Sequence, residues 1–180
     1  LMNKNIELSK IKFPCIVKPN AQGSTFGLSM VENKDEFERA ISLASKYDRN
    51  IIIENYIKGG EITVGILDGE PLPIVEIVPE HQIYDYECKY SPGMSKYICP
   101  ANIDKSLTKK IKRDSVEIFE ILGCSSYSRL DFILDNDGKY YFLELNTLPG
   151  MTSTSLLPIA AKNSGLSFNQ LISKIIEVSI

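Results

Sequence analysis

Two Asp-Gly pairs constrain the fold of this 180-residue chain more than any other feature of its sequence. The pairs, Asp68-Gly69 and Asp137-Gly138, each separate two runs that are rich in β-branched and aromatic residues. An Asp-Gly pair favours the tight turn between antiparallel strands, because both residues tolerate the positive φ that such turns use. The sequence therefore predicts two β-hairpins, over residues 61–79 and 128–146.

Shorter strands and four helices are predicted around these hairpins. The strands cover residues 13–19, 28–32 and 50–57, and the helices follow Asn33, run from about 104 to 122, cover 156–163, and start at about 168. Asn33 is the expected N-cap of the first helix, with Glu36 in the capping-box position. Helical spacing predicts the buried stripes Phe37, Ala40, Ile41 and Ala44 in the first helix and Leu107, Ile111, Ile118 and Leu122 in the second. Because the predicted strands pair mainly as antiparallel hairpins, the expected class is α+β.

Residues 80–100 show neither a helical nor a strand period and contain four tyrosines. A loop of this length is usually functional or disordered, and its aromatic content argues against simple disorder. Lys89 and Tyr90 are candidates for contacts made by a lid, which we expect at 82–97. A tyrosine-rich loop packed on the surface is the alternative.

The composition excludes several classes of function. A net charge of −3 and a single short basic run, KKIKR on a predicted helix, give no nucleic-acid-binding surface. The four cysteines and the only histidine, His81, form no zinc-binding pattern, so reduced thiols in a cytoplasmic protein are expected. No apolar run reaches the roughly 20 residues that a membrane span needs, and no membrane partner is expected.

Four polar residues interrupt the second predicted hairpin. Arg129 and Asp131 alternate on one strand, and Glu144 and Asn146 alternate on its partner, so all four side chains can project from one face. Two carboxylates and an amide oxygen make the oxygen-rich site that Mg²⁺ prefers. A solvent-facing surface with salt bridges is the alternative.

Two further segments indicate nucleotide binding less specifically. Lys18 ends a strand and precedes a loop of glycines and hydroxyls that can hold phosphates, although it is neither a Walker nor a GxGxxG motif. Glu54 and Glu61 flank a Gly-Gly break, where backbone groups can contact an adenine and Glu61 a ribose. A plain surface turn and a charged hairpin end are the respective alternatives.

The segments IVKPNAQGSTFG, IIIENYIKGGEITVGIL, YDYECKY, RLDFIL, LELNTLPGMT and SLLP occur in this order. Together they resemble the D-alanine–D-alanine ligases, which belong to the ATP-grasp carboxylate–amine ligases, over residues 13–178. LELNTLPGMTSTSLLP is specific to that group, whereas RLDF and LELN alone indicate only the broader ATP-grasp set. The resemblance implies a leader at 1–12, a central subdomain at 13–80 and a C-terminal subdomain at 81–180, with antiparallel sheets enclosing the nucleotide.

The resemblance also implies a role for each candidate residue. ATP would contact Lys18, Glu54, Asn55, Ile57, Glu61, Lys89 and Leu143, and two Mg²⁺ ions, or Mn²⁺ in their place, would bind Asp131, Glu144 and Asn146. ATP would phosphorylate the carboxylate of one D-alanine, and the amine of a second would attack the acyl phosphate, for peptidoglycan precursor synthesis. Ser24 and Tyr90 would orient the first substrate, Arg129 and Gly150 would stabilise the tetrahedral oxyanion, and Ser155 and Leu156 would hold the second carboxylate.

The chain departs from the family pattern in three respects. Asn55 stands where many relatives carry lysine, and Ser126 where they often carry glycine. Nothing ahead of Lys12 supplies the N-terminal domain of the family, so we expect this chain alone to catalyse poorly or not at all and the intact protein to be a homodimer. The alternatives left open are a D-serine or D-lactate second substrate and a non-catalytic ATP-binding module.

Overall fold

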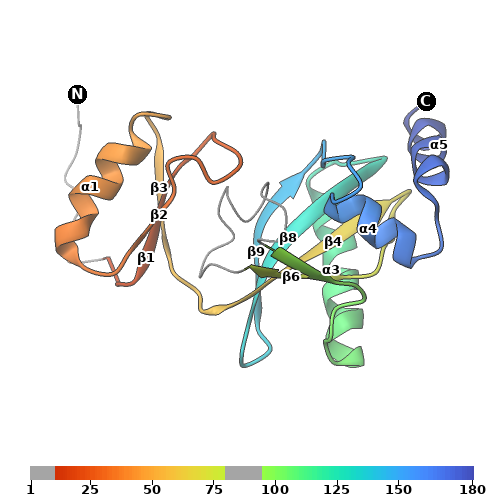
Figure 1. Cartoon of the computed structure of the whole chain (residues 1–180), viewed down its shortest axis with the longest axis horizontal. Helices are drawn as coiled ribbons and strands as arrows, with labels where there is room; N and C mark the ends of the chain where they lie inside the picture. Colours follow the sequence, from red (N-terminus) through yellow and green to blue (C-terminus); the bar gives the residue numbers. More distant parts are fainter. Residues whose placement is uncertain (1–10, 80–94) are drawn as a thin grey trace. The chain divides into compact units, whose positions relative to one another are not determined.

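The computed structural model describes residues 11–79 and 95–180, which fall into two compact units (Figure 1). The first unit comprises residues 11–57, and the second comprises 58–79 together with 95–180. Each unit combines one antiparallel sheet with one or more helices, which confirms the predicted α+β class. The two units are described separately below.

The first unit is a three-stranded sheet with one helix against it. Its strands are β1 (Cys15–Pro19), β2 (Ser29–Val31) and β3 (Ile51–Asn55), in the order β2-β1-β3, and its helix is α1 (Lys34–Ala44). The four residues of the predicted stripe on α1 are all buried, and they pack on Cys15, Val17 and Val31 of the sheet. Since side chains alternate along a strand, Ile16 and Lys18 lie on the face of β1 that turns away from α1.

The start of α1 follows the prediction with one difference. The side chain of Asn33 accepts hydrogen bonds from the backbone N–H groups of Asp35 and Glu36, as an N-cap does. The Glu36 carboxylate, however, accepts from the side-chain amide of Asn33 and from the backbone N–H of Glu32, 3.0 Å away in each case. The predicted return bond to the N-cap backbone is therefore displaced by one residue.

The second unit contains a six-stranded antiparallel sheet. Its strands are β4 (Gly59–Leu67), β5 (Glu70–Pro71), β6 (Val75–Pro79), β7 (Ser95–Ile98), β8 (Tyr127–Asp135) and β9 (Tyr140–Asn146). The order is β7-β6-β4-β8-β9, with β5 paired to β4. Both predicted hairpins are confirmed, as β4 pairs with β5 and β6 and β8 pairs with β9.

The two hairpin turns differ in type. Asp68 and Gly69 form a two-residue turn in which both residues have positive φ, 55° and 75°. In the second hairpin, the backbone N–H of Asp135 donates to the carbonyl of Lys139, and the Asp135 side chain accepts from the backbone N–H of Lys139. These bonds close a three-residue loop in which Gly138 has the positive φ, 79°. Both turns still place glycine where a side chain would be strained.

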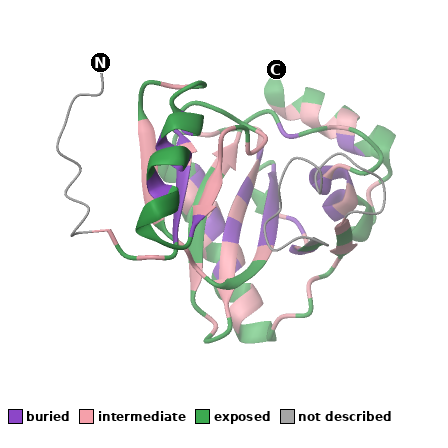
Figure 2. Ribbon diagram, turned by 60° about the vertical axis from the view of Figure 1, so that its left-hand side comes forward, coloured by how far each residue is buried: buried purple, intermediate pink, exposed green. Residues whose placement is uncertain are grey.

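Helix α3 (Lys105–Ile121) covers one face of this sheet, and Figure 2 shows where buried residues lie along the strands. Ile62, Val64 and Ile66 of β4 and Leu130 and Phe132 of β8 form the core beneath it. On the helix, the buried residues are Ile111, Ser115 and Phe119, which differs from the predicted stripe. Leu107 and Ile118 pack at the margin, and Leu122 is 55% exposed because it lies past the last helical residue. The prediction for Leu122 was therefore wrong.

Helix α4 (Leu156–Asn163) lies on the opposite face of the sheet, and α5 (Phe168–Ser179) follows it. Gly65 of β4 allows the close approach of α4, because a Cβ at residue 65 would lie 2.5 Å from Cδ1 of Leu157. The hydroxyl of Ser126 donates to the carbonyl of Val178, 3.0 Å away, near the end of α5. The serine that departs from the family pattern thus ties α5 to the start of β8.

The division between the units differs from the subdomain boundary expected after residue 80. Strand β4 pairs with β8 along its whole length, from Gly59 opposite Asp135 to Leu67 opposite Tyr127. Residues 58–79 therefore belong to the second sheet, and the compact units divide after Ile57. A hairpin that pairs with a distant strand cannot be assigned to one subdomain from local sequence alone.

The C-terminal end of the expected loop is also different. Residues 95–98 form β7, which pairs antiparallel with β6, so the expectation of a loop through residue 97 was wrong there. A four-residue strand is too short to show a sequence period. Residues 80–94, which include His81, Lys89 and Tyr90, lie outside the described residues.

Two observations on the described residues relate to what the composition led us to expect. No helix in the described ranges combines the length and the apolar composition needed to cross a membrane. Cys15, Cys99 and Cys124 carry free thiols.

Candidate functional site

Four polar side chains gather on one face of the β8–β9 hairpin. In the strand register, Arg129 lies opposite Asn146 and Asp131 lies opposite Glu144. The neighbours Leu130 and Phe132 are 0% and 1% exposed and face α3, so Arg129 and Asp131 face the other way. The structure thus brings together the four residues that the sequence grouped.

A β-bulge in β9 makes this grouping compatible with the core. Asp131 pairs with Glu144 but Phe132 pairs with Phe142, which leaves Leu143 as the extra residue. With regular alternation, Phe142 would share the face of Glu144; the shift instead lets Phe142 contact Phe132, with ring centroids 5.7 Å apart. The bulge therefore sends the aromatic side chain and the carboxylate to different faces of the hairpin.

Asp131 is the centre of a hydrogen-bond network. Arg129 donates from Nε to Oδ1 at 2.9 Å and from Nη2 to Oδ2 at 2.7 Å, and the amide nitrogen of Asn146 donates to Oδ2 at 3.1 Å. The same amide nitrogen donates to Glu144 Oε1 at 3.2 Å. The Arg129 and Asp131 side chains are 18% and 15% exposed, so the ion pair is partly shielded from solvent.

Thr63 is a residue of this network that sequence reasoning missed. It lies directly opposite Asp131 in the β4–β8 pairing, is 1% exposed, and its hydroxyl is 2.6 Å from Asp131 Oδ1. The only sequence signal was a hydroxyl inside the apolar run ITVGIL. Its meaning depended on the register between β4 and β8, which are far apart in sequence.

The donor set around Asp131 fits a hard divalent cation. Asp131, Glu144 and Asn146 offer two carboxylates and an amide oxygen, which is the chemistry that Mg²⁺ selects. Across the described residues, no group of three or more His, Cys, Asp or Glu side chains could hold a metal ion. The cluster thus relies on an amide as its third ligand, and a half-turn of the Asn146 amide would present its oxygen in place of its nitrogen.

The N-terminus of α4 is left uncapped by its own N-cap residue. The hydroxyl of Ser155 makes no capping bond; it accepts instead from the backbone N–H of Thr152 at 2.9 Å. Gly150 lies against it, because a Cβ at residue 150 would be 2.8 Å from Ser155 Oγ. Leu156 begins the helix with a buried side chain, so its backbone N–H is the group available to a ligand. Such a terminus favours an anion.

In the first unit, the predicted residues Lys18 and Glu54 form an ion pair. Lys18 lies opposite Ile52 and Glu54 lies opposite Ile16, so the two side chains are diagonal neighbours on the face away from α1. Their charged atoms are 2.7 Å apart, and the side chains are 26% and 36% exposed. The resemblance implied separate ATP contacts for Lys18 and Glu54, whereas the structure joins the two side chains in an ion pair.

The loop after Lys18 has an unusual backbone. Ser24, Thr25 and Gly27 all have positive φ, of 55°, 61° and 76°. Gly27 also allows close packing, since a Cβ there would lie 2.7 Å from the ring of Tyr47. Non-glycine residues in this conformation cost about 1 kcal/mol or more each, and such strain concentrates at ligand-binding sites.

The remaining predicted residues are distributed over both units. Asn55 ends β3 and Ile57 follows it in the first unit, whereas Glu61 lies on β4 in the second. Glu61 is two residues from Thr63 and therefore points to the same face of the sheet. Lys89 and Tyr90 lie outside the described residues.

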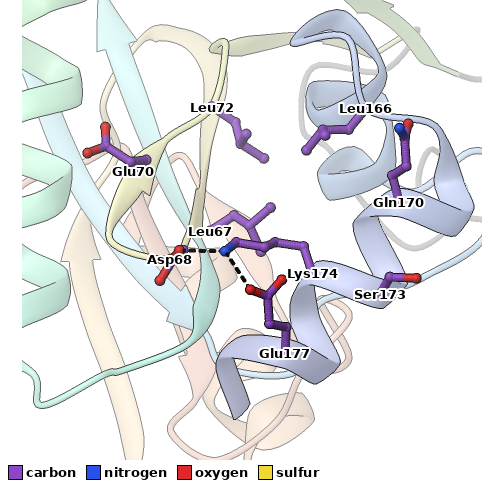
Figure 3. A pocket seen from close by; sticks show the side chains of 9 residues that line it. All are labelled: Leu67, Asp68, Glu70, Leu72, Leu166, Gln170, Ser173, Lys174 and Glu177. Atoms are coloured by element: carbon purple, nitrogen blue, oxygen red, sulfur yellow. Dashed lines mark ion pairs between the residues drawn. The ribbon is translucent and has the colours of Figure 1, made fainter. Parts of the chain in front are cut away.

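A hollow of about 470 Å³ lies elsewhere in the second unit, between the turn after β4 and helix α5 (Figure 3). Lys174 crosses it to reach Asp68 at 2.9 Å and Glu177 at 3.6 Å. Its apolar walls are Leu67, Leu72 and Leu166. None of the candidate site residues predicted from sequence lines it, so it is separate from the candidate site.

Similarity to solved structures identifies the fold class of the chain. A D-alanine–D-alanine ligase from Bacillus anthracis matches with a TM-score of 0.85 and 38% identity, over 98% of this chain and 58% of that one. The VanG D-Ala:D-Ser ligase from Enterococcus faecalis matches with a TM-score of 0.83 and 34% identity, over 96% of this chain and 51% of that one. With its antiparallel sheets and the polar face of β8 and β9, the chain has the ATP-grasp fold.

The family follows from the sequence comparison. Residues 2–177 match the model of the D-ala D-ala ligase C-terminus, and the chain belongs to this family. D-alanine–D-alanine ligases from Geotalea uraniireducens (strain Rf4) and Aquifex aeolicus (strain VF5) are 45% and 48% identical over 94% and 92% of this chain. The same alignments cover 55% and 56% of those relatives, so the chain spans about half the length of the curated relatives it matches.

Proposed function

We propose that this chain forms the nucleotide- and metal-binding part of an ATP-dependent ligase that joins two D-alanines. The observation that carries the proposal is the face of β8 and β9 on which Asp131, Glu144, Asn146 and Arg129 are in contact. Because the chain spans about half of its relatives, the reaction is proposed for a protein of their full length that contains it.

The proposed reaction has two steps. A carboxylate oxygen of the first D-alanine attacks the γ-phosphorus of ATP, which forms an acyl phosphate and releases ADP. The amine of the second D-alanine then attacks the acyl carbon, the bond from that carbon to the phosphate oxygen breaks, and the amine loses a proton. Phosphate and the dipeptide are the products. Positioning and electrostatic stabilisation carry both steps.

Asp131, Glu144 and Asn146 would hold two Mg²⁺ ions, or Mn²⁺ in their place. When bound, the ions would neutralise charge on the phosphate oxygens. Arg129 already orients Asp131 through two hydrogen bonds, and the Asn146 amide lies against Asp131 and Glu144, where a half-turn would present its oxygen to a cation. Preformed orientation of this kind lowers the cost of assembling the site.

The other residues are proposed to bind the substrates. Lys18 and Lys89 would contact ATP phosphates, Glu54, Asn55, Ile57 and Leu143 the adenine region, and Glu61 the ribose. The Lys18–Glu54 ion pair keeps the Lys18 ammonium group on the face away from α1. Ser24 and Tyr90 would orient the first D-alanine, and the left-handed backbone at Ser24 and Thr25 supports a ligand-binding role for that loop.

Arg129 and the backbone N–H of Gly150 are proposed to stabilise the negative oxygen of the tetrahedral stage. The uncapped start of α4 would take the carboxylate of the second D-alanine through Ser155 and Leu156. Gly65 supports this arrangement. It lies opposite Arg129 in the sheet and beneath Leu157 of α4, which brings the helix start to the same face as Arg129.

Binding of ATP and Mg²⁺ by the chain tests the proposal. Calorimetric titration should show binding that requires Mg²⁺ and disappears in Glu144→Ala, while Glu70→Ala, an exposed carboxylate on β5, should bind as the parent does. Absence of nucleotide binding by both this chain and a full-length protein would contradict the proposal. Phosphate release by the full-length protein with D-alanine, D-serine and D-lactate then identifies the second substrate.

D-Serine is the second candidate substrate, because a D-Ala:D-Ser ligase is 34% identical to this chain. Nucleotide binding without phosphate release on any of the three substrates would instead support a non-catalytic module. We place the reaction in the cytoplasm, where ATP is supplied, with a homodimer as the proposed assembly and peptidoglycan precursors as the product class.

A further inference from the structure

The two oxygens of Asp131 have different surroundings. Oδ1 accepts from Thr63 at 2.6 Å and from Arg129 Nε at 2.9 Å. Oδ2 accepts from Arg129 Nη2 at 2.7 Å and from the Asn146 amide at 3.1 Å. Since each carboxylate oxygen has about two acceptor positions, both oxygens are filled by these donors. A cation can reach Asp131 only where a donor is able to leave.

The donor that can leave is on Oδ2. The Asn146 amide also contacts Glu144 and can turn by a half rotation to present its oxygen, which frees one acceptor position on Oδ2. Thr63 is 1% exposed and lies directly across the β4–β8 pair from Asp131, so its oxygen stays beside Oδ1. Only its hydroxyl proton can rotate, toward the carbonyl of Leu130.

The Thr63 hydroxyl donates its hydrogen bond to Asp131. The hydroxyl is also 3.0 Å from the carbonyl of Leu130, but its single proton can serve one acceptor well. Hydrogen bonds to an ionised carboxylate are shorter and stronger than those to a neutral carbonyl, and the contact with Oδ1 is the shorter one, at 2.6 Å. Oδ1 is thus held from beneath the sheet face by a buried donor.

We propose that Thr63 is a positioning residue that restricts Asp131 to binding a divalent cation through Oδ2 alone; this rests on the proposed function. Coordination by one carboxylate oxygen suits Mg²⁺, which takes an octahedral shell at about 2.0–2.1 Å. Ca²⁺, at about 2.3–2.6 Å, accepts both oxygens of a carboxylate. By occupying Oδ1, Thr63 disfavours the two-oxygen mode and favours Mg²⁺ over Ca²⁺.

The experiment compares Thr63→Val, which removes the donor with little change in shape, with Thr63→Ser, which keeps the hydroxyl. Mg²⁺ and Ca²⁺ affinities are measured by calorimetry on the whole chain with an ATP analogue whose β,γ-bridge is an imido group. Thr63→Val should lose roughly 10- to 100-fold in Mg²⁺ affinity, as for other groups that orient metal ligands. Its preference for Mg²⁺ over Ca²⁺ should fall, and Thr63→Ser should restore both values.

The outcomes separate this inference from the proposed function. If the parent chain binds no Mg²⁺-nucleotide, both fail. If the parent binds but a folded Thr63→Val keeps the same Mg²⁺ affinity and the same Mg²⁺-to-Ca²⁺ ratio, only the role of Thr63 is overturned. A loss shared equally by both ions, without rescue in Thr63→Ser, would show a structural role and would also overturn it. If Thr63→Val unfolds, Thr63→Ala removes the same donor without added bulk.

Discussion

The hairpin that turns at Asp68-Gly69 and the hairpin that turns at Asp137-Gly138 differ along their strands more than at their turns. On the first, the strand opposite β4 is interrupted between β5 and β6, with a one-residue shift in its register, and the residues of β4 from Ile62 to Leu67 are all buried. On the second, β9 carries a bulge, and residues from Tyr141 to Glu144 are exposed. Turn residues thus establish a hairpin, whereas a bulge within one strand and the polar side chains on the face away from α3 distinguish the one that carries the site.

The largest expected effect is on ligand binding by the second hairpin. Asp131→Ala removes the centre of the network, leaves Arg129 without its bidentate partner, and should abolish detectable Mg²⁺-dependent ATP binding. Glu76→Ala, on the β6 strand, is the matched control, and it should keep binding within error. Equal loss in the two variants, measured by calorimetry, would remove the distinction between the hairpins.

The first hairpin should be the more sensitive one in stability. Gly65→Ala places a Cβ 2.5 Å from Leu157 and should destabilise the chain by about 1–3 kcal/mol, because α4 must shift. Gly60→Ala, in the same strand with nothing within 4 Å of the added carbon, should stay within about 1 kcal/mol of the parent. Urea unfolding followed by circular dichroism measures both. Identical midpoints would show that α4 does not depend on this close approach.

Each hairpin is joined to a helix by one side-chain interaction, which we call its tie: Tyr140 with Asp114 for the second hairpin and Lys174 with Asp68 for the first. The tie of the second hairpin is the more shielded from solvent. The Tyr140 hydroxyl donates to the Asp114 carboxylate of α3, and Lys110 lies 5.2 Å above the Tyr140 ring. Burial, with the hydrogen bond to Asp114, raises the pKa of Tyr140 to about 12. Tyr140→Phe should therefore cost about 1–2 kcal/mol at neutral pH.

The pH dependence of this tie follows from the direction of the shift. The folded state retains the Tyr140 proton above pH 10, where the unfolded chain loses it, so the stabilisation is present below pH 10 and is lost as the pH rises toward 12. The difference in unfolding free energy between the parent and Tyr140→Phe should shrink over that interval. A constant difference from pH 8 to 12 would contradict the assignment.

The smallest effect is expected at the tie of the first hairpin. Lys174 of α5 reaches Asp68 at 2.9 Å, and the hydrogen bond with Asp68 raises the pKa of Lys174. The pair is exposed, and exposed ion pairs contribute little and are screened by salt. Lys174→Ala should lower the unfolding midpoint only slightly at low salt and not at all at high salt. A large, salt-independent loss would make the two ties equivalent.

The sequence predicted most of what depends on local rules. The hairpins, the N-cap at Asn33 and the stripe of α1 follow from turn chemistry, capping and helical period, and each is confirmed. Alternation along two strands was also sufficient to group Asp131 with Glu144. The roles assigned to the grouped residues stay predictions.

What escaped prediction depends on pairing between distant segments. Thr63 meets Asp131 only through the register of β4 against β8, and β7 is too short to show a period before it pairs with β6. The bulge at Leu143 was invisible for the same reason, since an extra residue is defined by the partner strand. Leu122 was placed in a stripe that ends with the helix before reaching it.

The extra residue at Leu143 has a consequence for anyone who would move this site to another protein. Grafting an Asp, a Glu and an Asn onto an unbroken hairpin would give the right spacing on the metal side but would turn Tyr140 and Phe142 outward with them. The alternation of side chains along β9 must shift by one residue between the aromatic residues Tyr140 and Phe142 and the ligands Glu144 and Asn146. A transplanted site therefore needs the bulge as much as it needs the ligands.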